Sequence, residues 1–73
     1  MNKPTDFSPE QKKLLADFEE ARTEWNRGAF GIAARLRQHV RLATLHKEIR
    51  EAGIESALTD DQIVDGMRAA GYV

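Results

Sequence analysis

The sequence contains no cysteine, which excludes a disulfide framework, a thiolate metal site and a cysteine nucleophile. It also lacks long apolar runs. The first residues, MNKPTDFSPEQKK, hold no run of the kind that a signal peptide needs. The longest uncharged stretch, residues 28–34, is far too short to span a bilayer. We therefore expect a cytoplasmic protein that does not enter a membrane.

Residues suited to catalysis or metal binding are also scarce. A nucleophile needs an adjacent base and a group that orients it, whereas Ser8 and Ser56 both fall at predicted caps or turns. His39 and His46 lie about 10 Å apart along a helix, too far to share one metal ion, and no third ligand is evident. The sequence predicts neither an enzyme nor a bound metal or cofactor.

Charge is plentiful but unevenly distributed. The net charge is −1, from 11 Lys or Arg and 12 Asp or Glu. Residues 1–26 carry four cations and six anions, residues 27–50 carry six cations and one anion, and residues 51–73 carry one cation and five anions. A basic middle between acidic ends favours a polar binding surface. The alternative is that the three segments neutralise one another in the folded protein.

The first helix is predicted over residues 9–27. Ser8 suits the cap, Pro9 suits the first helical position and Gln11 completes a capping box. The residues that follow at helical spacing place one apolar face on this helix, and Gly28 suits its end. That face consists of Leu14, Phe18, Ala21 and Trp25.

Residues 32–52 contain neither proline nor glycine, so they favour a helix. They carry two apolar faces about half a turn apart. One helix packed on two sides is preferred over two helices that break near residues 41–44. The preceding Phe30 is expected to tuck under the turn at residues 28–31. The two faces are Ile32, Leu36, Val40 and Ala43, and Leu42, Leu45, Ile49 and Ala52.

A last helix is predicted from Asp60 to Ala70, with Thr59 and Gln62 as a second capping box and Gly71 at its end. Its buried stripe is expected to be Ile63, Val64, Met67 and Ala70. The fold class is therefore all-α. We expect a small bundle of three or four helices in a single domain over residues 8–73, preceded by a flexible tail over residues 1–7.

The basic middle supplies the candidate binding residues. On a helical wheel one strip combines arginines and both histidines, and a second basic line runs beside it. The tail could order on contact with a partner. The alternative is a solvated basic face without function. The predicted partner-binding residues are Arg35, His39, His46 and Arg50 of the strip, Arg37 and Arg41 of the second line, and Lys3 and Phe7 of the tail.

Two other binding classes compete with a protein-binding regulator. Residues 44–70 could form a helix-turn-helix, but the helix that enters the major groove would then carry three acids and only Arg68. We therefore expect no direct sequence-specific DNA binding, and a small DNA-binding repressor remains the alternative. A scaffold that self-associates through spare apolar surface such as Trp25 is the third class, although a monomer is expected.

The whole chain, from MNKPTDFSPEQKKLLADF to TDDQIVDGMRAAGYV, resembles the small RNA polymerase-binding transcription regulators of lytic Xanthomonas phages. The likeness lies in size and character over all 73 residues. It implies a protein of the host cytoplasm that binds host RNA polymerase at the N-terminal part of the β′ subunit. Such a regulator inhibits initiation by displacing the sigma factor and acts as an antiterminator. No catalytic or metal residue carries over.

Overall fold

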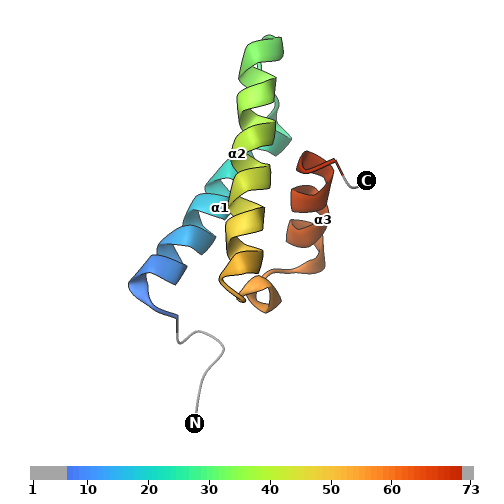
Figure 1. Ribbon diagram of the computed structural model, residues 1–73. Helices are drawn as coiled ribbons and strands as arrows, with labels where there is room; N and C mark the ends of the chain where they lie inside the picture. Colours follow the sequence, from blue (N-terminus) through green and yellow to red (C-terminus); the bar gives the residue numbers. More distant parts are fainter. Residues whose placement is uncertain (1–6, 72–73) are drawn as a thin grey trace.

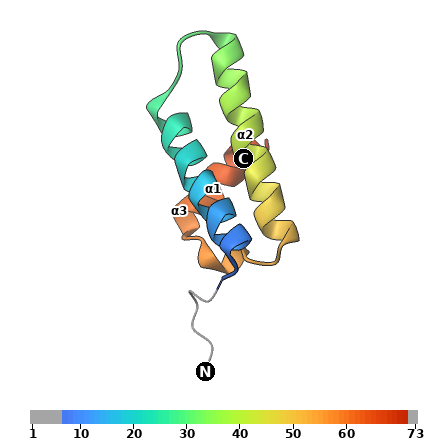
Figure 2. The ribbon, with the colours of Figure 1, turned by 90° about the vertical axis from the view of Figure 1, so that its left-hand side faces the viewer.

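The computed structural model describes residues 7–71, and within this range every element is helical (Figure 1). The first two helices lie side by side and run in opposite directions (Figure 2). The third helix packs against both of them. The elements are α1 (Pro9–Arg27), α2 (Ile32–Glu51), a 3-10 turn (Glu55–Ala57) and α3 (Asp60–Ala69). Of the predicted tail, only Phe7 falls among the described residues.

Both predicted capping boxes are present. The backbone N–H of Gln11 donates to Ser8 Oγ at 3.1 Å, and the Gln11 side chain accepts from the backbone N–H of Ser8 at 3.0 Å. Thr59 and Gln62 form the same reciprocal pair at the start of α3, at 3.2 and 2.8 Å. Each box satisfies two backbone donors that a helix start would leave unpaired. Local sequence therefore sets both starts.

The second helix is unbroken over Ile32–Glu51, which confirms the preferred prediction of one helix. Only one of its two predicted apolar faces is buried. Leu42 and Ile49, from the second face, are both 0% exposed. They meet the apolar face of α1 and the segment that follows α2. The buried apolar residues form one cluster, which consists of Phe18, Ala21, Leu42, Ile49 and Ile54.

The third helix approaches α2 through a glycine. Gly66 is the buried residue of α3, and a Cβ at this position would lie 2.6 Å from Cγ of the His46 ring. The predicted buried stripe of this helix is wrong in part, because Val64 and Ala70 are exposed. The physical reason is that the buried face of α3 centres on Gly66. Only a residue without a side chain lets the backbone of α3 approach the imidazole of His46 this closely.

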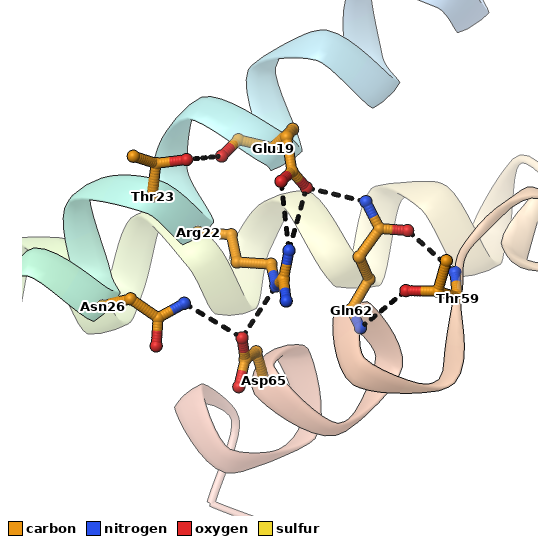
Figure 3. A network of polar contacts seen from close by, with 7 residues as sticks. All are labelled: Glu19, Arg22, Thr23, Asn26, Thr59, Gln62 and Asp65. Carbon is orange, nitrogen blue, oxygen red and sulfur yellow. Dashed lines mark hydrogen bonds and ion pairs between the residues drawn. The ribbon is translucent and has the colours of Figure 1, made fainter.

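A polar network ties α3 to α1 (Figure 3). Arg22 Nε donates to Asp65 Oδ2 at 2.7 Å, and Arg22 Nη1 lies 3.0 Å from Glu19 Oε1. The Gln62 amide donates to Glu19 Oε2 at 2.7 Å, and the Asn26 amide donates to Asp65 at 3.1 Å. The hydrogen bond to Asp65 raises the pKa of Arg22 above its usual value. Part of the acidity of the C-terminal segment is therefore compensated inside the fold.

The tight contact at Gly66 predicts an unusual result for Gly66→Ala. Alanine normally stabilises a helix interior by about 0.5–1 kcal/mol relative to glycine. Here the added methyl group would collide with His46, so we expect a loss of about 1–3 kcal/mol in the free energy of unfolding. Urea unfolding followed by circular dichroism measures this change. Arg68→Ala, at an exposed position of the same helix, is the control, and a stabilised Gly66→Ala would contradict the described packing.

The Arg22–Asp65 pair also predicts a measurable loss. Arg22→Met keeps most of the apolar stem and removes the guanidinium, so that Asp65, whose side chain is only 13% exposed, loses its cation. We expect a cost of about 1–2 kcal/mol in the free energy of unfolding. The matched control is Lys13→Met, which removes an ion pair with Asp17 at the surface and should leave the unfolding midpoint unchanged. Equal midpoints for both variants would contradict a stabilising pair.

Candidate protein-binding surface

The predicted basic strip is only partly at the surface. His46 is 2% exposed, with its ring beside Phe18 and its Nε2 atom 2.9 Å from Glu55 Oε2. The His46 side chain is therefore not open to a partner in this structure, and its role in partner binding stays a prediction. The cause is again Gly66, because the space left by the missing side chain is filled by the imidazole. Arg50, the other end of the strip, is 56% exposed and lies 3.8 Å from Glu55.

The N-terminal half of the strip, Arg35 and His39, packs against Trp25 of α1. Arg35 Nη1 donates to the backbone carbonyl of Trp25 at 2.6 Å, and the guanidinium lies 4.8 Å from the centre of the Trp25 ring. Arg35 is therefore fixed by a hydrogen bond and a cation–π contact. The His39 ring meets the edge of the same indole, with 5.7 Å between ring centres. Both residues are half-buried and serve the α1–α2 contact.

The two arginines of the second basic line differ: Arg41 forms ion pairs with α1, and Arg37 forms none with the described residues. Arg41 pairs with Glu20 at 2.7 Å and with Glu24 at 2.8 Å. The hydrogen bond to Glu20 raises the pKa of Arg41 above its usual value. Arg37 is exposed and makes no ion pair within residues 7–71. Neutralisation within the chain, the alternative that the sequence left open, therefore holds for Arg41 but not for Arg37.

The two tail residues predicted to contact a partner have different positions. Phe7 is partly buried and packs against the core cluster, so it is not a free anchor in this structure. This differs from the prediction because an aromatic ring beside a small core gains more from burial than from exposure. Lys3 lies outside the described residues.

The first apolar face of α2 remains open to solvent. Ile32 is 81% exposed, Leu36 57% and Val40 63%. These three residues, called here the α2 stripe, were expected to pack on a second neighbour. That expectation is wrong for these three residues in the described part of the chain, whereas Ala43, the fourth residue of the predicted face, is half-buried and lines a groove together with Ala69 of α3.

Phe30 is also exposed, at 102%, so the prediction that it tucks under the turn is wrong. The flanking Gly28 and Gly31 adopt φ values of +91° and +90°, which other residues rarely adopt. These conformations carry the turn beyond the end of the core, as Figure 2 shows at the top of the hairpin. The ring therefore finds no apolar partner within the described chain.

The α2 stripe leads into a groove of about 610 Å³. Val40, Ala43 and Thr44 form its floor on α2, and Ala69 and Ala70 line it from the end of α3. Its charged lining residues are Lys47, Arg50 and Glu51. A mostly apolar concavity with a few charged groups around it is typical of a binding site. The stripe and the groove together form the candidate surface.

The exposure of the α2 stripe predicts that the same change, leucine to alanine, has different effects on the free energy of unfolding at two positions of α2. Leu36→Ala removes a side chain that mainly contacts water, so we expect a change of less than about 0.5 kcal/mol in the free energy of unfolding. Leu42→Ala, on the same helix, empties part of the core and should cost about 2–5 kcal/mol. Urea unfolding measures both. Comparable losses would show that Leu36 is buried in solution.

No family model matches the chain, and no curated protein or solved structure is significantly similar to it. Among residues 7–71, no helix is long and apolar enough to cross a membrane. No group of three or more histidine or acidic side chains in the same range could hold a metal ion.

Proposed function

We propose that this protein is a small regulator that acts by binding host RNA polymerase, without chemistry of its own. The observation that carries the proposal is the α2 stripe, an apolar row left open on a domain that has already closed its core. Exposed apolar rows beside polar groups mark protein interaction sites. The resemblance of the whole chain to phage regulators that bind polymerase supplies the identity of the partner.

The proposed mode of action is occupation of a surface on the polymerase. The regulator binds the N-terminal part of the β′ subunit, displaces the sigma factor and so inhibits initiation. In elongation it acts as an antiterminator. A 73-residue chain suits such a role, because it buries too little of its own chain to enclose a large catalytic pocket but can cover a protein patch.

Direct DNA binding has less support. Phosphate contacts dominate the affinity of proteins for DNA and require free cations. A DNA-binding protein of this kind would use Arg35, Arg37 and Arg41. Arg35 is held by Trp25 and Arg41 by two glutamates, so only Arg37 of the three is not engaged by the described chain. The start of α3 carries Asp60 and Asp61, which would repel phosphates.

A binding and transcription assay tests the proposal. Immobilised protein is incubated with purified host polymerase, and we expect the complete enzyme to be retained through β′. In run-off transcription the same protein should reduce initiation and increase read-through of a terminator. Duplex DNA alone should show no mobility shift at physiological salt, because α3 is acidic.

The controls separate polymerase binding from general adhesion. A heat-unfolded sample of the same chain should retain no polymerase, since the surface depends on the fold. Failure of the folded protein to retain any polymerase subunit, or unchanged initiation at saturating protein, would contradict the proposal. A salt-sensitive shift of duplex DNA would favour the DNA-binding alternative instead.

A further inference from the structure

We infer that the α2 stripe and its groove accept an amphipathic helix whose apolar face is bordered by acidic residues. This deepens the proposed function, because it rests on a protein partner and names the kind of element that the partner presents. The three residues of the stripe are four positions apart, so they form a straight row about 12 Å long. Such a ridge packs naturally against the ridges of a second helix.

The shape of the site supports a rod-like occupant. The row of Ile32, Leu36 and Val40 continues into the groove between Ala43 of α2 and Ala69 of α3. Small residues on both walls allow a backbone to approach closely. A helix of about 12–15 residues would cover the row and enter the groove. A bilayer is flat on this scale and would meet the ridge without filling the concavity.

Residues of this sequence outside the described range are too short to cover the row. Residues 72–73 span at most about 7 Å, which reaches the groove near Ala70 but not Leu36 or Ile32. Residues 1–6 span at most about 21 Å. They begin from Phe7, and the length of α1, about 28 Å, separates that end from the level of Ile32. Neither segment can therefore cover the full stripe of its own chain.

The charges beside the stripe determine the sign of the partner. Residues 32–47 contain no acidic side chain, and in the groove Lys47 and Arg50 stand against one acid, Glu51. Arg37 and Lys47 are exposed on the outer side of α2, and neither forms an ion pair with the described residues. Acidic borders on the partner helix would meet these cations, which favours association and sets the orientation. In a second copy of this chain, the central α2 segment would bring the same cations together.

A peptide titration tests the inference on the full chain. The probe is a synthetic helical peptide of about 15 residues, with leucine at every third and fourth position and glutamate beside the apolar face. The matched peptide has lysine in place of glutamate. We record amide chemical shifts of the ¹⁵N-labelled protein during each titration. We expect changes centred on the outer side of residues 32–47, with the lysine peptide weaker by about tenfold or more.

Variants locate the binding. The double variant Leu36→Ala/Val40→Ala should bind the glutamate peptide with an affinity about tenfold lower, or lower still. Val64→Ala, at the exposed valine of α3, is the matched control and should bind like the original protein. Arg37→Ala should weaken binding less and reduce its dependence on salt. Unfolding curves of all variants confirm that they remain folded.

Several results would overturn the inference. These are equal affinity for the two peptides, absence of binding at millimolar peptide concentration, shift changes away from α2, or a concentration-dependent dimer through the stripe. Stronger binding to vesicles of anionic lipid than to the glutamate peptide would assign the surface to membranes instead. Peptide binding without polymerase retention would reject only the proposed function. Polymerase retention unaffected by Leu36→Ala/Val40→Ala would reject only the stripe as its contact.

Discussion

The packing of α1 and α3 on the central helix leaves one apolar row of that helix uncovered. The helix α2 carries apolar residues on two sides, and the core closes around Leu42 and Ile49. The row at Ile32, Leu36 and Val40 is then left to solvent at 57–81% exposure. In the isolated chain these side chains contribute little to stability, because they remain in water. Their burial against a partner would contribute about 1–2 kcal/mol each to the free energy of binding. That unused free energy is available for binding a partner.

The distribution of charge follows from the same arrangement. Glu20 and Glu24 of α1 pair with Arg41 of α2, and Asp65 of α3 pairs with Arg22 of α1. Arg35 is held against Trp25. Within α2, Arg37 and Lys47 are exposed and form no ion pair with the described residues. The basic middle of the sequence therefore contributes less positive surface than its net charge suggests, and what remains borders the apolar row. Hydrophobic contact would provide most of the affinity, and charge would select the partner.

Local signals in the sequence are sufficient to predict the three α-helices. The two capping boxes fixed the starts of α1 and α3, and the absence of breakers between Ile32 and Glu51 fixed one long helix. The two faces of α2 were also visible in the spacing of its apolar residues. Which face would be buried was not visible, because that depends on the approach of α3. The approach is set by one residue, Gly66, whose lack of a side chain admits His46. A helical wheel cannot reveal the space beside a glycine, so the sequence alone predicts His46 at the surface and the stripe in the interior.

Photo-crosslinking from the stripe would identify what covers it. A photoreactive amino acid at position 36 would report what covers the α2 stripe when polymerase is present, and the same group at position 64 serves as the reference. The account predicts a crosslink from position 36 to a polymerase subunit, at an acidic amphipathic helix, and little or none from position 64. Crosslinks from position 64 alone, or from position 36 only to a second copy of this chain, would contradict it.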